Sequence, residues 1–346
     1  MRIGVAKENY AADEALFDSP TQRFWFGVLL AVLIGFPFLV SPYWLYLACL
    51  VSINIASTTG LNILTGYTGL VSLGHAAFLG LGAYTVAILE ARAGTHFLFN
   101  LLAGGCVAAM GGLLVGIPSL RVKGLYLAIA TIAASFILHF VFYNWTTVTG
   151  GSAGLTVPPA RLFGIVLEES FQLYWPIVTI TVLLLFGAAN LFRTRIGRAF
   201  IAIRDRDISA EVLGIPLLRY KLMAFGLSSF YAGVAGGLWA YFFRSVTPES
   251  FPLMLSIFYL AAVIVGGMGT ILGGILGATF MTMVPELLKL LVGLLPAYRD
   301  AIVILSPIRT IVFGVLIIGF LIFEPNGLAA IWQRLRRFFS LWPFRT

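Results

Sequence analysis

The feature that most constrains this chain is a series of apolar runs, each close to the length of a membrane-spanning helix. A hydrocarbon core about 30 Å thick requires about 20 apolar residues at a helical rise of about 1.5 Å per residue. Ten runs approach this length: 24–40, 43–64, 75–92, 97–117, 124–143, 173–192, 221–243, 253–267, 270–285 and 302–323. Charged residues make up only 10% of the chain, whereas a soluble domain contains about a quarter. We therefore predict an all-α polytopic membrane protein with about ten transmembrane helices.

The two ends of the chain are more polar than the middle. The first 23 residues have mixed charge and lack the basic region, apolar core and cleavage site of a signal peptide. We interpret residues 1–23 as a cytoplasmic segment, 24–328 as the transmembrane domain and 329–346 as a basic cytoplasmic tail. The runs 253–267 and 270–285 are short and are joined by "VGGMGTILGG", so they are either two spans or one span and a re-entrant segment.

Arginine and lysine indicate the orientation, because loops rich in these residues stay in the cytoplasm. The segment 193–220 carries six arginines and is the most basic loop. With this loop in the cytoplasm, alternation of ten spans places both termini in the cytoplasm and the loop 144–172 outside. Topology then accounts for the net charge of +8, and we expect no nucleic-acid partner.

Titratable side chains inside the apolar runs are few. Between residues 24 and 167 the only acidic residue is Glu90, and His75, His96 and His139 share no metal-binding spacing. An intramembrane enzyme using His75 or His139, a metal site and an ion-coupled carrier are therefore disfavoured. The sequence also lacks the phosphate-binding motif G-x-x-x-x-G-K-[ST]. We expect a transport subunit that binds no cofactor itself and is driven by a separate ATPase.

The basic loop contains an amphipathic segment that is too charged to cross a membrane. Over residues 198–213, Ile201, Ile208 and Val212 recur at spacings of seven and four, which predicts one helix with an apolar face. The glycine and proline of the following "LGIP" mark its C-terminal end. Such a helix either lies on the membrane surface or docks into a groove of a partner, and the pattern alone favours neither.

Another segment is rich in glycine, although glycine weakens helices. The stretch "GYTGLVSLG" (66–74) has glycines at the same offsets as "GGMGTILGG" (266–274), which is either a repeat or chance. We predict that one helix ends near Thr65, that the next begins near His75, and that the broken backbone lines a translocation pathway. The residues expected there are Gly66, Tyr67, Thr68, Gly69, Ser72, Gly74, His75, Gly266, Gly267 and Gly269. The alternative is that the glycines serve only close packing.

Several blocks of sequence are specific enough to suggest a family. They are "TGYTGLVSLGHAAFLGLGAYT" (65–85), "IGRAFIAIRDRDISAEVLGIPLLRYKLMAFGLSSFYAGVAGGLWA" (196–240), "PESFPLMLSIFYLAAVIVGGMGTILGGILGA" (248–278) and "FEPNGL" (323–328). In this order and spacing they resemble the LivM-type permeases of branched-chain amino acid ABC importers. The resemblance covers nearly all of 43–328, whereas the proline and arginine of "SPIRTIVFG" depart from the pattern.

The resemblance implies an assembly in the bacterial cytoplasmic (inner) membrane. Its other members would be a second, LivH-like permease, two ABC ATPase subunits that bind ATP, and a soluble solute-binding protein. The segment 198–213 would dock on the ATPase, with Arg204 and Arg206 facing acidic groups there. The coupling residues implied are Arg198, Ile201, Arg204, Ile208, Ala210, Glu211 and Gly214. The implied cargo is a branched-chain amino acid, although members of this family also carry urea, short amides or other small polar solutes.

Overall fold

A computed structural model describes residues 20–120, 124–162, 164–293 and 311–341, except 313, 316, 321 and 325. Within these residues, eight helices are long and apolar enough to cross a membrane. The predicted run 24–40 lies in α2 (Pro20–Leu39), whose strongly apolar part is the shorter stretch Leu30–Leu39. Of the predicted run 302–323, residues 302–310 lie outside the described residues, and Arg309 is among them. The polytopic helical architecture is thus confirmed, whereas the count of ten spans is not.

The long helices begin and end within a few residues of the predicted runs, except that α13 extends eight residues beyond the run 270–285. They are α3 (Pro42–Asn62), α4 (His75–Ala93), α5 (Phe97–Ser119), α6 (Leu125–Asn144), α8 (Ser170–Arg193), α11 (Leu217–Phe243), α12 (Leu253–Gly266) and α13 (Ile271–Gly293). The last two are separate helices joined by a short turn, and by length and composition both are candidate spans.

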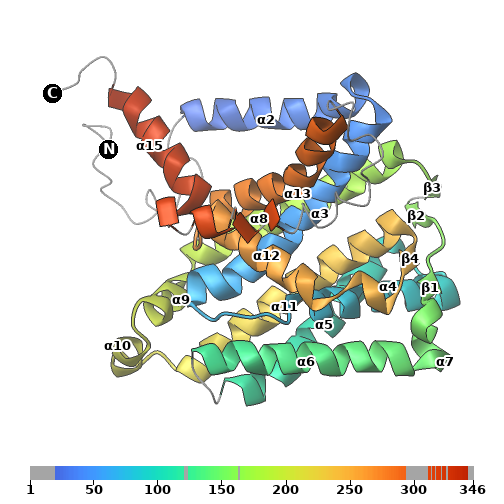
Figure 1. Cartoon of the computed structure of the whole chain (residues 1–346), viewed down its shortest axis with the longest axis horizontal. Helices are drawn as coiled ribbons and strands as arrows, with labels where there is room; N and C mark the ends of the chain where they lie inside the picture. Colours follow the sequence, from blue (N-terminus) through green and yellow to red (C-terminus); the bar gives the residue numbers. More distant parts are fainter. Residues whose placement is uncertain are drawn as a thin grey trace.

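Helix α11 lies at the centre of the bundle, where it packs against α3, α4 and α5 (Figure 1). Glycine permits this close packing. A Cβ atom at Gly82 of α4 would clash with the backbone of Gly233 on α11, and one at Gly236 would clash with the carbonyl of Leu79. Small residues at helix crossings are typical of membrane bundles. Lipid tails are as apolar as the side chains, so the helices associate through close packing and not through the hydrophobic effect.

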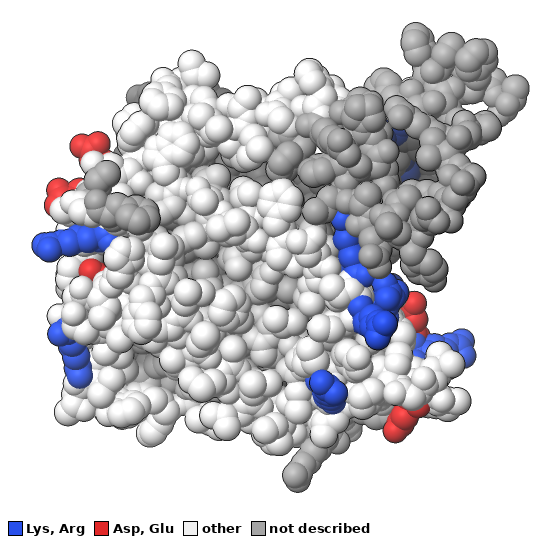
Figure 2. All heavy atoms as spheres, turned by 180° about the vertical axis from the view of Figure 1, so that it is seen from behind, with Lys and Arg blue, Asp and Glu red and all other residues white. Residues whose placement is uncertain are grey.

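The outer helices carry their large apolar side chains on the surface. Examples that are exposed are Leu102 and Leu114 of α5, Phe136 and Phe140 of α6, and Leu183 of α8. On the face drawn in Figure 2, the charged side chains lie toward two opposite sides. Among the described residues, the broad white band between these sides shows no lysine, arginine, aspartate or glutamate. An uncharged band with exposed apolar side chains is the expected lipid-facing surface of a spanning bundle.

The two ends of the bundle carry different short elements. At one end are α7 (Thr146–Thr149), η2 (Gly151–Ala153), η3 (Pro248–Ser250) and two small antiparallel pairs, β1 (Leu155–Thr156) with β4 (Ser245–Val246) and β2 (Ala160–Leu162) with β3 (Ile165–Leu167). These strands are not apparent from the sequence, because they are only two or three residues long. At the other end are α9 (Arg195–Asp205), α10 (Asp207–Val212) and α15 (Gly327–Leu341) (Figure 1).

Candidate functional site

The first glycine-rich segment begins with an unusual helix end. Helix α3 continues as a π-helical turn, η1 (Ile63–Tyr67), so the helical segment ends close to the predicted Thr65. The hydroxyl of Thr68 then donates hydrogen bonds to the carbonyls of Ile63 (2.9 Å) and Leu64 (2.8 Å), and Gly69 turns the chain away with φ of 72°. The helix thus ends in a π-helical turn, a rare element that a sequence pattern does not indicate.

The chain then runs along α6 to the start of α4 at His75, as predicted. The backbone N–H of Leu73 donates to the hydroxyl of Thr131 on α6 (3.0 Å). A Cβ atom at Gly74 would lie 2.7 Å from the Thr131 carbonyl oxygen. Close approach to α6 is thus one physical reason for a glycine at this position.

The polar side chains predicted for a pathway make contacts inside this chain. His75 is buried, and its Nε2 lies 3.0 Å from both the hydroxyl and the carbonyl oxygen of Ser57. The ring of Tyr67 stacks on that of Phe192, and the Ser72 hydroxyl accepts the N–H of Gly74 (3.3 Å). These contacts match the packing alternative, and a role in the pathway stays a prediction.

The second glycine-rich segment forms the turn between α12 and α13. Gly267 and Gly269 have φ of 114° and 73°, in the region that favours glycine. A Cβ atom at Gly267 would lie 2.7 Å from the carbonyl oxygen of Asn326, and one at Gly266 would clash with the carbonyl of Gly273. Side chains are therefore excluded on both sides of this turn.

The two glycine-rich segments, 200 residues apart in sequence, meet in space. The Asn62 side chain joins them, because its Oδ1 accepts the N–H of Gly269 (3.0 Å) and its Nδ2 donates to the carbonyl of Thr270 (2.8 Å). A Cβ atom at Gly66 would clash with Asn62 Oδ1 and with the backbone nitrogen of Gly269. The sequence indicated the glycines, but it gave no signal for Asn62.

Arg204 connects this meeting point to α9. Its Nη1 donates to the carbonyl of Gly66 (3.2 Å), and the same atom lies 2.5 Å from where a Cβ of Gly269 would be. Its Cγ lies 3.3 Å from the corresponding position at Gly69. Its other nitrogens contact Asp205 of its own helix at 3.1 Å. Arg204, which we expected to face a partner, is thus used within the chain.

The prediction of one helix over 198–213 is wrong. The chain forms α9 and then α10, separated at Arg206, which is extended with φ of −156°. The first turn of α10 is fixed separately, since Asp207 accepts the N–H of Ile208 (2.9 Å) and pairs with Lys221 of α11 (3.7 Å). The spacing of apolar residues along a sequence does not reveal that one residue between them leaves the helical conformation. The sequence therefore suggested a continuous helix.

The break also separates the three residues predicted to share one face. Ile201 of α9 packs partly buried against the core, next to the buried side chain of Phe200. In contrast, Ile208 and Val212 of α10 are 70% and 84% exposed, and Leu213 beyond them is equally open. The exposed apolar surface formed by Ile208, Val212 and Leu213 is hereafter the α10 surface; Leu213 was not predicted as part of it.

The remaining predicted coupling residues occupy distinct environments. Arg198 and Glu211 are exposed, whereas Ala210 is buried. Gly214 follows α10 with φ of 82° and has nothing within 4 Å of a Cβ position. Its glycine is therefore explained by backbone conformation, not by close approach to another part of this chain.

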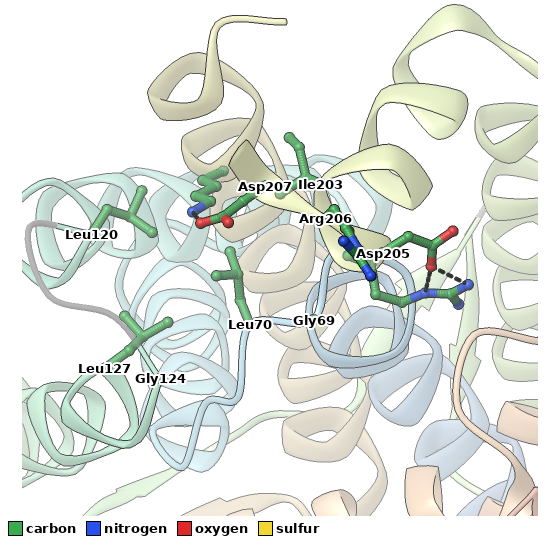
Figure 3. A pocket seen from close by; sticks show the side chains of 11 residues that line it. Gly69, Leu70, Leu120, Gly124, Leu127, Ile203, Asp205, Arg206 and Asp207 are labelled. Atoms are coloured by element: carbon green, nitrogen blue, oxygen red, sulfur yellow. Dashed lines mark hydrogen bonds and ion pairs between the residues drawn. The ribbon is translucent and has the colours of Figure 1, made fainter. Parts of the chain in front are cut away.

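A cavity of about 250 Å³ lies where the break in α9–α10 faces the first glycine turn (Figure 3). One wall is charged and includes Arg206, Asp207 and Lys221. The other wall is apolar and includes Leu70 and Leu127.

Comparison with known proteins decides the family. The family model described as "Branched-chain amino acid transport system / permease component" matches residues 43–321. The chain belongs to this permease family. No solved structure gives a significant match.

Curated relatives agree with this assignment. The chain is 35% identical over 292 residues to the "High-affinity branched-chain amino acid transport system permease protein LivM" of Salmonella typhimurium and to that of Escherichia coli K12, covering 78% of this chain and 69% of each relative. It is 29% identical over 248 residues to the "Autoinducer 2 import system permease protein LsrC" of Salmonella paratyphi B, covering 67% and 66%. The chain is therefore a multi-pass permease component of the bacterial inner membrane, and its relatives are transport proteins, not enzymes.

Proposed function

We propose that this permease imports branched-chain amino acids, driven by separate ATPase subunits that dock on the α10 surface. The substrate follows from the similarity to two LivM permeases whose names specify branched-chain amino acid transport. A second, LivH-like permease and a soluble binding protein would complete the importer, with ATP bound only by the ATPase subunits. The LsrC relatives make autoinducer 2 the alternative cargo.

The observation that carries the docking proposal is the contrast between the two helices after α8. The α10 surface exposes three apolar side chains to solvent, which is the form of a helix that binds in a partner's groove. Helix α9 is anchored by the buried side chains of Phe200 and Ile203, and its Arg204 reaches both glycine turns. A displacement of α10 would therefore pass through α9 to the junctions α3–α4 and α12–α13.

Arg204 is the positioning residue in this proposal. A guanidinium holds several donors in one plane, so it resists rotation better than a single ammonium group. The hydrogen bond to the Gly66 carbonyl then makes α9 and the first glycine turn move together. The glycine-rich segments would act as the flexible part of the translocation pathway.

The docking proposal is tested by purifying the assembled importer with single charged substitutions on the α10 surface. Val212→Asp should reduce the amount of ATPase that copurifies, because it puts a charge into an apolar contact. Val166→Asp is the matched control, since Val166 is also exposed but lies on β3 at the other end of the bundle. Full ATPase recovery with Val212→Asp would contradict docking at this surface.

Coupling is tested in the reconstituted importer by ATP hydrolysis with and without the loaded binding protein. We expect Gly214→Trp to abolish both stimulation and uptake, because tryptophan resists φ of 82° and disturbs the end of α10. Normal stimulation would favour the alternative that α10 rests on the membrane surface. Uptake by the chain alone in proteoliposomes without ATP would instead indicate an ion-coupled carrier.

The cargo is tested on the binding protein, since selectivity in such importers depends largely on that partner. Calorimetric titration with leucine, isoleucine, valine, urea and autoinducer 2 should give heat of binding only for the amino acids. Binding of urea or autoinducer 2 without amino-acid binding would overturn the substrate proposal and leave the docking proposal intact.

A further inference from the structure

Helix α15 is held firmly at its start. Ala329 is buried, and a Cβ atom at Gly327 would lie 2.5 Å from the backbone nitrogen of Gly267. Arg334 forms two hydrogen bonds of 2.9 Å to the carboxylate of Glu324, just before the helix. Figure 1 shows α15 leaving the bundle at the same end as α9. Its direction is therefore set by contacts with the rest of the chain.

Beyond the first turn, α15 exposes large apolar side chains. Ile331, Leu335 and Phe338 are exposed at helical spacings of four and three, which place them on one face, and Trp332 beside them is 54% exposed. Gln333 and Arg336 are exposed at positions on the opposite face. The helix is thus amphipathic along its outer part, and apolar area of this kind is unfavourable in water.

The charge of α15 is entirely positive. Residues 327–341 contain three arginines and no aspartate or glutamate. Glu324 neutralises Arg334, which leaves a basic face beside the apolar one. A surface that covers this helix should therefore be both apolar and negatively charged.

The segment before α15 indicates which surface this is. Ile311, Val315, Ile318 and Ile322 are exposed at spacings of four and three, within a run of the sequence that has the composition of a membrane span. In a membrane permease this stripe faces lipid. Helix α15 follows four residues after its end, so it starts at the edge of the bilayer.

We propose that α15 lies in the headgroup region of the membrane and binds anionic phospholipid. The apolar face would enter the boundary with the acyl chains, and Trp332 would occupy the interface that tryptophan prefers. The basic face would contact phosphate groups. This proposal needs only a membrane-spanning chain and is independent of the cargo and of docking at the α10 surface.

The test uses spin labels on the full-length permease in vesicles. Cys49 and Cys106 are first replaced by alanine, and single labels are then attached through Ile331→Cys, Leu335→Cys, Gln333→Cys or Arg336→Cys. All four positions are exposed, so the labels should not disturb folding. Accessibility is measured with oxygen, which concentrates in lipid, and with a water-soluble nickel complex, in phosphatidylcholine vesicles with and without phosphatidylglycerol.

We expect labels at 331 and 335 to be accessible to oxygen and protected from nickel, and labels at 333 and 336 to show the reverse. Phosphatidylglycerol should increase this difference. Arg336→Gln should lower the ratio of protected to unprotected label at 331 by about fivefold, because one arginine at an anionic surface contributes about 1 kcal/mol. Arg219→Gln, an exposed arginine at the start of α11, is the control and should have no effect.

Two outcomes would overturn the proposal. Equal exposure of all four labels to nickel in both kinds of vesicle would mean that α15 stays in water. Protection that arises only after ATPase subunits are added would assign the apolar face to a protein contact.

Discussion

The two glycine turns of this permease resemble each other where they meet Arg204 and differ elsewhere. Gly69 and Gly269 occupy matching positions in "GYTG" and "GGMG", and their φ angles are 72° and 73°. Both lie against the side chain of Arg204. The shared φ is the left-handed conformation that Gly154 and Gly327 also adopt, at 69° each, so the φ angles alone do not distinguish a repeat from chance. The shared contact with Arg204 is the feature that the two turns have in common.

The differences concern what covers each turn. The first is preceded by a π-helical turn and followed by an extended connection packed on Thr131 of α6. The second passes from α12 to α13 within four residues and is covered by Asn326 and Ala329. The common part is thus the side facing α9, which suggests that contact with α9 limits how these turns can be built.

The largest effect is expected where the two turns touch. Gly66→Ala would place a methyl group against Asn62 Oδ1 and the Gly269 backbone, and neither can move without separating the turns. Overpacking of this kind costs about 1–3 kcal/mol. We expect uptake of labelled leucine by cells that express the importer to be nearly abolished.

The control for this change is Gly35→Ala on α2, which has nothing within 4 Å of its Cβ position and should leave uptake unchanged. If Gly66→Ala transports normally, the close contact between the turns is not needed for function.

A smaller effect should distinguish the two equivalent glycines. At either position, holding alanine in the left-handed conformation costs about 1–2 kcal/mol. A Cβ at Gly269 would lie 2.5 Å from Arg204 Nη1 and 2.9 Å from the carbonyl oxygen of Gly66, whereas a Cβ at Gly69 would lie 3.3 Å from the nearest atom of Arg204, its Cγ. The thermal unfolding midpoint of the purified importer should therefore fall further for Gly269→Ala.

Combining Gly269→Ala with Arg204→Ala sharpens this test. Removal of the arginine should raise the unfolding midpoint of the Gly269→Ala variant part of the way back. The interaction free energy of the double-mutant cycle should then be about 0.5–3 kcal/mol, as for residues in contact. Strict additivity would mean that Arg204 and Gly269 do not constrain each other.

Arg204 itself is expected to affect coupling more than assembly. Arg204→Lys loses the planar guanidinium, whose Nη1 donates to Gly66 while its other nitrogens contact Asp205. Stimulation of ATP hydrolysis by the loaded binding protein should therefore fall severalfold while ATPase copurification is kept. Arg206→Ala, at the exposed break, should reduce this stimulation only mildly, since contacts between surface charges are worth about 0–1 kcal/mol. Equal losses for both variants would remove the special role of Arg204.

The smallest effect on uptake is expected for the residues that cover the first turn. Thr131→Val removes the acceptor of the Leu73 N–H and should lower stability by about 1–3 kcal/mol, as for a buried donor left unpaired, with uptake largely retained. Ser135→Ala on the same helix is the control, because its hydroxyl bonds, among the described residues, to the nearby Ile132 carbonyl of its own helix. A severe loss of uptake by Thr131→Val would show that the connection to α4 is as critical as the Arg204 side of the turn.

The sequence by itself determined the class of fold and most helix boundaries. Apolar runs of bilayer length need helices, because unpaired backbone groups are too costly in lipid, and the start of α4 at His75 could be predicted from the glycines before it. The family was also accessible, since long motifs such as residues 196–240 keep their order and spacing.

Tertiary structure alone decided how the site is assembled. The break at Arg206, the inward turn of Arg204 and the bridge made by Asn62 depend on contacts between residues far apart in the chain. A pattern of apolar spacing reports which face of a local segment is apolar, but not which distant backbone a long polar side chain reaches. Only packing of α3, α9 and α12–α13 against one another brings Gly66, Arg204 and Gly269 to one point.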